Sequence, residues 1–397
     1  MLLPEFYYFA SGPRTTSKER PDSMITKERV TNIPIDCEHN WKEANQDFWC
    51  RYLGGSLAIL LRHAGYSEEA QYGHWLFLNK VIAPNLGLSL HAQSRWKSFM
   101  TDDGGPVELS WEWPVGTETP KIRYSIEPIG PQAGTWLDPY NTSVLGPFNK
   151  FLLETLSETA MVWFNHFEKE FCPTQEHFLR MSSEDHSTHH FYAFDLEDDK
   201  TTAKAYFFPA LRAQEAKMST LDVICQAISR APQWRLAGSQ ALVSFRNFAT
   251  KPASAKLEFS MLAIDLVEPS LSRVKIYYRC RRTDFESVVH NLTLGERERA
   301  AALRQGLESL RALWDALFQV DSQSKTSLPY VNHQTAGILY YAELRPGSSM
   351  PSTKIYLPVR HYSVTDQHIT TTLSSYFRTS VHHCAVQGYK KTMQSLL

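Results

Sequence analysis

Hydrophobic and polar positions alternate with a period of two in four pairs of short segments along the chain. Such alternation predicts strands with one buried face, and the turn residues between the members of each pair predict hairpins. The pairs are 107–113 with 121–127, 190–196 with 203–208, 259–266 with 273–278, and 338–344 with 354–357. We therefore expect four antiparallel β-hairpins.

Between the hairpins, hydrophobic residues recur every three or four positions, which is typical of amphipathic helices. The helical segments are 47–64, 75–82, 147–169, 219–231 and 296–318, with a short one ending at Tyr376. The repeating unit is thus helix–strand–strand–helix, about 70 to 85 residues long. Consecutive hairpins separated by helices predict an α+β fold, in which an antiparallel sheet curls toward a barrel with the helices outside.

The 397 residues allow two or three domains or one large closed one. Because the repeat runs through most of the chain, we expect a single barrel domain over residues 36–377. Residues 1–35 are largely polar and predict a flexible leader, and residues 378–397 form a tail that matches no strand pair.

Composition and charge narrow the class of protein. The chain has 41 Lys and Arg against 42 Asp and Glu, so it lacks the cation excess of nucleic-acid binders and of basic membrane-surface proteins. No uncharged apolar stretch is long enough to span a membrane. The six cysteines have no paired spacing, which indicates reduced thiols. We expect a cytoplasmic protein that contacts neither membrane nor nucleic acid.

The second strand of every hairpin carries cations, and three of the four also carry tyrosines at strand spacing. Arg273, Lys275 and Tyr277 share one face by the period of two. The equivalent residues are Arg123 in the first hairpin, Lys204 and Tyr206 in the second, and Lys354 and Tyr356 in the fourth. If helices cover the outside, five cations converge on the lumen.

A cluster of like charges repels itself unless a multivalent anion balances it. Lys and Arg are the usual donors to phosphate oxygens, and tyrosine hydroxyls add hydrogen bonds. For any single lysine a solvated strand face is the simpler interpretation. The repetition over four hairpins favours a diphosphate site instead.

Acidic residues suggest two further sites. Glu108 falls on the lumenal face of its strand, where it would accept an N–H or O–H hydrogen bond from a substrate or form a salt bridge with one of the cations. The box Asp195–Asp199 has a spacing suited to magnesium diphosphate, but it lies at a strand end and turn, where Asp is common. His186, His189 and His190 have no further zinc ligand at a suitable spacing. We therefore predict no metal site.

Five motifs, in order between roughly residues 40 and 377, resemble the fungal dimethylallyltryptophan synthase family of aromatic prenyltransferases. They are Gly105–Ser110, Lys121–Pro128, Lys204–Pro209, Ser272–Tyr277 and Thr353–Arg360. The resemblance implies an ABBA barrel, with antiparallel strands around a lumen and helices outside. It also implies transfer of a dimethylallyl group from dimethylallyl diphosphate to an aromatic ring, commonly an indole, without a metal cofactor.

The resemblance also implies roles for individual residues. Those that would bind the diphosphate and shield the allyl cation are Arg123, Lys204, Tyr206, Arg273, Lys275, Tyr277, Lys354 and Tyr356. Glu108 would accept the indole N–H. For the final ring proton we consider His190, because it shares a strand face with Tyr192 and lies beside the strand of Lys204.

One departure from the family pattern concerns the end of the barrel. The family closes with a fifth hairpin, whereas the segment after Arg360 contains no strand pair, so eight strands are expected instead of ten. The seam would then stay open, be filled by another segment or a second subunit (as in a homodimer), or leave an impaired form. We expect a metal-independent prenyltransferase of alkaloid metabolism that acts on an indole-containing acceptor. The alternatives are a phenol, quinone or xanthone acceptor, or a diphosphate-binding protein without turnover.

Overall fold

The structure is a computed structural model that describes residues 36–396, except 90–94, 102, 114–119, 139, 175–187, 235–238, 255, 322–325 and 381–382. The predicted leader, 1–35, lies outside the described residues.

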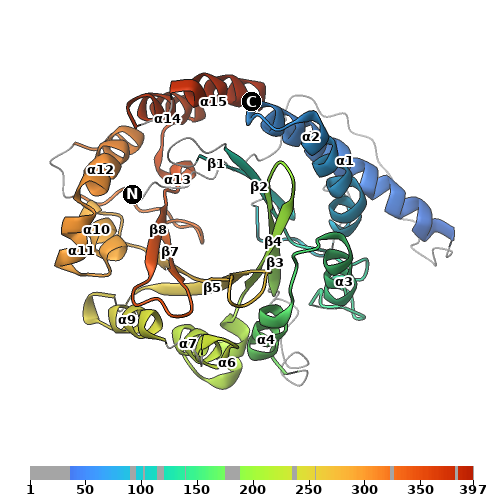
Figure 1. The fold of residues 1–397 in the computed structure, drawn as a ribbon, viewed down its shortest axis with the longest axis horizontal. Coiled ribbons are helices and arrows are strands. Elements are labelled where there is room, and N and C mark those ends of the chain that lie inside the picture. Colours follow the sequence, from blue (N-terminus) through green and yellow to red (C-terminus); the bar gives the residue numbers. More distant parts are fainter. Residues whose placement is uncertain are drawn as a thin grey trace, which may run out of the picture.

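Eight antiparallel strands form one sheet in which sequence order is also spatial order. The strands are β1 (Val107–Glu112), β2 (Lys121–Ile126), β3 (His190–Leu196), β4 (Thr201–Phe207), β5 (Glu258–Asp265), β6 (Val274–Cys280), β7 (Ile338–Leu344) and β8 (Ser352–Tyr356). The sheet curls around a central space and helices surround it (Figure 1). The four predicted hairpins and the α+β barrel architecture are confirmed.

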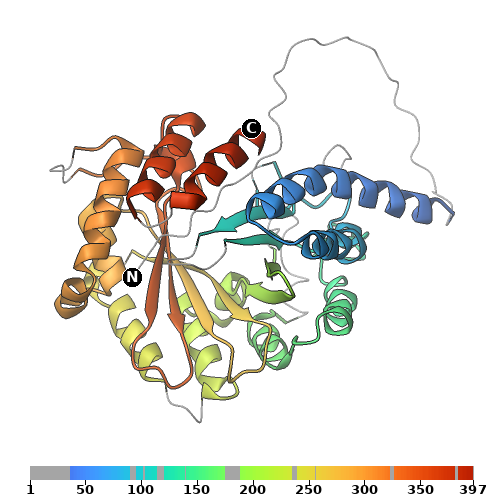
Figure 2. The same cartoon turned by 45° about the horizontal axis from the view of Figure 1, so that its top comes forward.

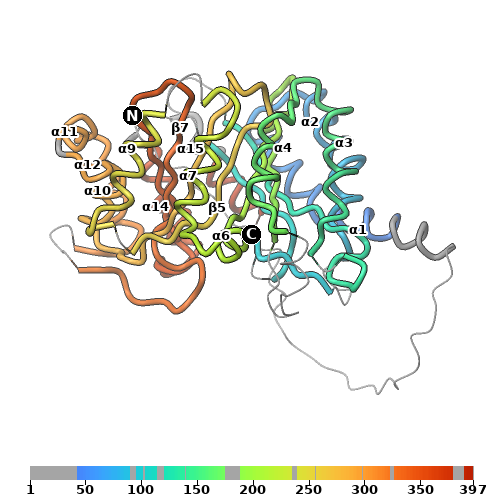
Figure 3. The backbone as a smooth tube through the Cα atoms, turned by 90° about the horizontal axis from the view of Figure 1, so that it is seen from below, coloured from blue at the N-terminus to red at the C-terminus, as the bar shows by residue number. Residues whose placement is uncertain are grey.

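The described residues form thirteen α-helices. They are α1 (Asp36–His63), α2 (Glu68–Phe77), α3 (Leu145–Thr155), α4 (Val162–Phe171), α6 (Ala210–Ala216), α7 (Thr220–Arg230), α9 (Gln240–Ala249), α10 (Phe285–Thr293), α11 (Arg297–Ala302), α12 (Arg304–Phe318), α13 (Val359–Tyr362), α14 (Asp366–Ser380) and α15 (His383–Leu396). The longer helices surround the sheet (Figure 3), whereas the short α13 follows β8 on the inner side of α14 (Figure 1). A π-helical segment, Leu78–Ile82, and a 3₁₀ turn, Ala83–Asn85, extend α2, and a second 3₁₀ turn is Pro252–Ser254.

The helix predicted over 147–169 is instead two helices, α3 and α4. The chain leaves the helical conformation at Leu156, and the N–H of Ala160 donates to the carbonyl of Leu266, 3.0 Å away. A tertiary hydrogen bond to the turn after β5 therefore replaces helical ones, which a local hydrophobic pattern cannot predict. None of the described helices combines the length and the apolar character needed to cross a bilayer.

The two faces of the sheet differ in chemistry, as the period of two requires. On β2, Ile122, Tyr124 and Ile126 are buried against the helices, whereas Arg123 and Ser125 point to the lumen. The same alternation continues through the other strands. The main hydrophobic core is thus the layer between sheet and helices, and the lumen contains polar side chains and a smaller cluster made mostly of tyrosines.

In the described part of the chain β1 and β8 do not pair, so the sheet has a seam between them. The helix layer nevertheless continues across it, because α14 and α15 lie between α12 and α1 (Figures 1 and 2). The hydroxyls of Ser309 and Tyr376 join α12 to α14 at 3.1 Å, and His63 joins α1 to Thr392 of α15 at 2.5 Å. The segment predicted as an atypical tail thus contributes a helix to this layer.

Aromatic side chains hold these two helices against the sheet. The ring of Trp113, just after β1, lies 5.4 Å from Phe377 and 6.1 Å from Tyr389, and Phe377 and Tyr389 are 5.4 Å apart. Both Phe377 and Tyr389 are buried. The helices α14 and α15 therefore bury apolar surface at the edge of the sheet.

We expect Phe377→Ala to lower the free energy of unfolding by about 3 kcal/mol, because it leaves a cavity beside Trp113. Thermal or urea unfolding measures the loss. Phe151→Ala is the control, since Phe151 is 49% exposed and its loss should change stability by less than about 0.5 kcal/mol. Equal stability of the two variants would show that α14 and α15 do not stabilise the seam.

Candidate active site

A polar cavity of about 330 Å³ lies in the lumen where the first three hairpins turn. Its lining residues are Glu112, Lys121, Arg123, Asp195, Glu197, Thr202, Lys204, Asp265, Val267 and Arg273. Three of the predicted cations, Arg123, Lys204 and Arg273, thus meet at one space although they come from three hairpins. The first residue of the acidic box, Asp195, lies among them.

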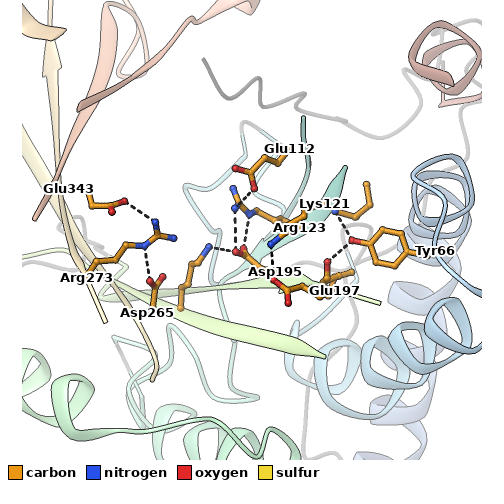
Figure 4. A network of polar contacts seen from close by, with 12 residues as sticks. Tyr66, Glu112, Lys121, Arg123, Asp195, Glu197, Asp265, Arg273 and Glu343 are labelled. Carbon is orange, nitrogen blue, oxygen red and sulfur yellow. Dashed lines mark hydrogen bonds and ion pairs between the residues drawn. The ribbon is translucent and has the colours of Figure 1, made fainter. Parts of the chain in front are cut away.

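Asp195 joins two of these cations. Its carboxylate is 2.6 Å from Nε of Arg123 and 2.5 Å from Nζ of Lys204, and Glu112 forms a second ion pair with Arg123 (Figure 4). Burial disfavours the charge on Asp195, but Lys204 and Arg123 outweigh it and hold the pKa of the carboxyl well below its usual range. Asp195 therefore stays ionised and orients both cations.

Arg273 has two carboxylate partners of its own. Its Nε lies 2.7 Å from Asp265, and its Nη1 lies 2.9 Å from Glu343 on β7 (Figure 4). Burial disfavours the guanidinium charge, but Asp265 and Glu343 raise the pKa of Arg273 above its usual value. The expected self-repulsion of the cations is thus relieved by lumenal carboxylates, which a search limited to second strands could not find.

Lys275 and Lys354 lie next to aromatic rings. Their ammonium groups are 5.0 Å and 5.9 Å from the centre of the Tyr341 ring. Burial, together with Lys204 and Arg273, lowers the pKa of Lys275 to about 7, and burial lowers that of Lys354 to about 7. No carboxylate of the described residues forms an ion pair with Lys275. An anion bound here would restore full protonation of Lys275.

Four tyrosines form a layer beside these lysines in the lumen. The ring of Tyr277 lies 5.9 Å from Tyr206, 5.3 Å from Tyr341 and 6.1 Å from Tyr356. Burial raises the pKa of Tyr206, Tyr277 and Tyr341 far above the usual value, so the phenols stay neutral. Sequence reasoning missed Tyr341, which lies in the first strand of the fourth hairpin. The period of two was a sufficient signal, because it places Tyr341 on the face opposite to that of Tyr340 and Ala342.

Glu108 lies on the lumenal face of β1. It pairs in register with Ser125, which pairs with Ala193, which in turn pairs with Lys204, so Glu108 and Lys204 are level in the sheet. It is partly accessible from the lumen and has neither an ion pair nor a hydrogen bond with the described residues. Burial raises the pKa of its carboxyl to about 8. The alternative of a salt bridge is therefore not seen.

His190 does not join this group, which corrects the expectation that it lies close to the substrate. It shares a face with Tyr192, as predicted, but that face packs against the helices. The His190 ring lies 5.7 Å from Phe164 of α4 and 5.2 Å from Phe207. Burial, together with His189, lowers the pKa of His190 to about 3, so it is a neutral core residue.

The described residues contain no group of three or more His, Cys, Asp or Glu side chains arranged to hold a metal ion. Asp198 and Asp199 of the acidic box lie in the exposed turn after β3, away from Asp195 in the lumen. His186 lies outside the described residues.

Comparison with known proteins agrees with this geometry. The family model described as tryptophan dimethylallyltransferase matches residues 45–392. The chain is 38% identical over 349 residues to 4-O-dimethylallyl-L-tyrosine synthase of Claviceps purpurea, covering 84% of this chain and 77% of that protein. It is 32% identical over 368 residues to 7-dimethylallyltryptophan synthase of Aspergillus fumigatus, covering 88% and 77%.

A solved structure shares the fold. NotF, crystallised with brevianamide F and DMSPP, superposes with a TM-score of 0.76 at 23% identity, covering 89% of this chain and 86% of NotF. The eight-stranded sheet is therefore an ABBA prenyltransferase barrel in which the described residues contain four hairpins. Fold, lumenal chemistry and sequence agree that the chain belongs to the tryptophan dimethylallyltransferase family of prenyltransferases.

Proposed function

We propose that this protein transfers a dimethylallyl group from dimethylallyl diphosphate to an aromatic acceptor, and that lumenal cations bind the diphosphate in place of a metal ion. The observation that carries the proposal is the convergence on one lumen of cations from four hairpins, a tyrosine layer and a carboxyl, Glu108, that has no partner in the described part of the chain. The names of the two relatives, both dimethylallyl synthases, support it.

The cations would stabilise the charge that builds on the leaving diphosphate. Arg123, Lys204 and Arg273 are already oriented by ion pairs, so little reorganisation is needed when the anion binds. Lys275 forms no ion pair with a carboxylate of the described residues, so its ammonium group can turn to the diphosphate. These side chains would thus supply the electrostatic stabilisation that a divalent cation supplies in other diphosphate sites.

Transfer begins when the bond between C1 of the dimethylallyl group and the diphosphate oxygen breaks and the electron pair leaves with the diphosphate. The faces of Tyr206, Tyr277, Tyr341 and Tyr356 would stabilise the allyl cation by cation–π contact, worth about 2 kcal/mol for a desolvated ring. The same rings exclude water that would quench the cation.

The acceptor then forms the new bond and gives up a proton. A carboxyl with a pKa of about 8 is well matched to accept that proton near neutral pH, and Glu108 is placed to receive an N–H or O–H hydrogen bond. An indole remains our first candidate for the acceptor. A phenol is the second, because the relative with 38% identity is named for tyrosine. Alkaloid metabolism, a cytoplasmic location and a homodimer stay predictions from the sequence.

Incubation with dimethylallyl diphosphate and a panel of indoles and phenols, with and without EDTA, tests the proposal. We expect a prenylated product whose rate of formation is unchanged by EDTA. Loss of product on chelation would contradict the metal-free role of the cations. Diphosphate binding with no product from any acceptor would instead support a binding protein without turnover.

A further inference from the structure

Tyr66 connects the helix layer to the sheet beside the polar cavity. It lies between α1 and α2 and is buried. Its side chain reaches the ends of β2 and β3, next to Lys121 and Glu197 of the cavity wall (Figure 4). Tyr66 itself is neither a predicted site residue nor part of that wall. Its contacts with the strands therefore point to a role one step removed from the diphosphate.

The hydroxyl of Tyr66 is built into the end of the ladder between β2 and β3. Ile122 and Leu196 are directly opposite in the register and form the last pair of this ladder. The N–H of Ile122 donates to the Tyr66 oxygen at 3.0 Å, and the Tyr66 O–H donates to the carbonyl of Leu196 at 2.5 Å. Burial raises the pKa of Tyr66 to about 12, so the phenol keeps the proton that it donates. One side chain therefore satisfies backbone groups of two different strands.

The next pair of the ladder carries an ion pair of the cavity. Arg123 and Asp195 are opposite each other in the register, one position from the pair that the Tyr66 hydroxyl bridges. The Asp195 carboxylate also binds Lys204. The last pair of a ladder frays most readily, because it has a neighbouring pair on one side only. A change in spacing at this end of β2 and β3 would therefore move Arg123 relative to Asp195.

Other residues of the acidic box are held from the same corner between helices. His74 Nε2 donates to the carbonyl of Glu197 at 2.7 Å, and the N–H of Ser67 donates to Asp198 at 2.9 Å. The His74 ring packs edge-on against Tyr66, with 5.7 Å between the ring centres. Burial lowers the pKa of His74, which favours the neutral ring. The box therefore anchors the turn after β3 to α2, a role that its spacing did not predict.

We propose that Tyr66 is a positioning residue for the diphosphate site: its hydroxyl fixes the ends of β2 and β3 and so holds Arg123 and Asp195 in the arrangement that receives the diphosphate. This inference rests on the proposed function. Without the hydroxyl, the N–H of Ile122 and the carbonyl of Leu196 lose a buried hydrogen-bond partner. The strand ends then fray or move together to pair directly. Either change displaces Arg123, so the cation is no longer preorganised for the anion.

Tyr192 offers a matched control because its hydroxyl is also hydrogen-bonded and the residue is also buried. It lies on β3 and donates to Asn149 of α3 at 2.7 Å, on the face turned to the helices. Tyr66→Phe and Tyr192→Phe each remove one hydroxyl and keep the ring, so we expect similar losses of melting temperature. If Tyr66 only stabilised the fold, the two variants would also have the same effect on diphosphate binding.

The test is calorimetric binding of dimethylallyl thiolodiphosphate and of inorganic pyrophosphate. We expect Tyr66→Phe to weaken the binding of both probes about 10-fold and Tyr192→Phe to leave both Kd values unchanged. A double-mutant cycle with Arg123→Gln identifies the residue through which Tyr66 acts. In the Arg123→Gln background, Tyr66→Phe should weaken binding by less than about 2-fold, because the residue that it positions is already gone.

Four results would overturn the inference. They are a Tyr66→Phe variant that binds both probes as tightly as the wild type, equal losses of affinity in the two phenylalanine variants, a 10-fold loss that persists in the Arg123→Gln background, and a Tyr66→Phe variant that does not fold. A wild type that binds neither probe would refute the proposed function itself. Tight binding by the wild type together with any of the four results would refute only the role of Tyr66.

Discussion

Replacement of Glu108 by alanine is expected to lower kcat by at least about 10²- to 10⁴-fold while leaving the Kd for dimethylallyl diphosphate unchanged. The carboxyl lies on β1, level with Lys204 but without an ion pair to it, so its removal does not disturb the cations. Steady-state kinetics with the preferred acceptor and calorimetry with dimethylallyl thiolodiphosphate measure the two effects.

The pH dependence gives an independent check on Glu108. The charged form accepts the proton, and its pKa in the empty lumen is about 8. With dimethylallyl diphosphate saturating at each pH, kcat/KM for the acceptor should therefore rise with pH up to about 8 and then level off. Glu158→Ala is the control, because Glu158 is an exposed residue paired with Lys200 and should leave the profile unchanged. Full turnover by Glu108→Ala on either an indole or a phenol would refute the role of this carboxyl.

Lys275→Ala is expected to weaken binding of dimethylallyl thiolodiphosphate by about 10- to 100-fold, since it removes a charge-assisted contact from a buried site. Calorimetry at fixed pH measures the change. Lys200→Ala removes an exposed lysine outside the lumen and should leave the Kd unaltered. If both variants bound as tightly as the wild type, Lys275 would not contact the diphosphate.

The affinity should also depend on pH in a definite direction. The pKa of Lys275 is about 7 in the empty lumen, and a bound anion raises it, so binding takes up a proton above pH 7. Affinity should therefore fall as the pH rises from 7 to 9, and the Lys275→Ala variant should show a weaker fall. Heats of binding in buffers with different ionisation enthalpies report the proton uptake.

The sheet could be predicted from the sequence because its signal is local. The period of two predicts both the strands and the face of each strand that points to the lumen. In the structure the predicted cations do point inward: Arg123, Lys204, Arg273, Lys275 and Lys354. The same period of two predicts that His190 and Tyr192 share one face of their strand. That face is turned to the helices, because Tyr192 donates to Asn149 of α3. The expected place of His190 beside the substrate is therefore wrong.

The carboxylates of the site could not be predicted in the same way. Asp195, Asp265 and Glu343 lie on different strands from the cations they bind, and only the register brings the partners together. The break between α3 and α4 likewise depends on a contact with a residue more than 100 positions away. The position of helix α15 likewise depends on contacts with Trp113 and α1, which lie far away in the sequence.

A crystal structure of the protein with dimethylallyl thiolodiphosphate, grown in EDTA, tests the central claim most directly. We predict that the diphosphate oxygens lie within hydrogen-bond distance of Lys204, Arg273 and Lys275, with the allyl chain against Tyr277. A diphosphate bound away from these side chains, or an analogue that binds only when a divalent cation is restored, would contradict the account.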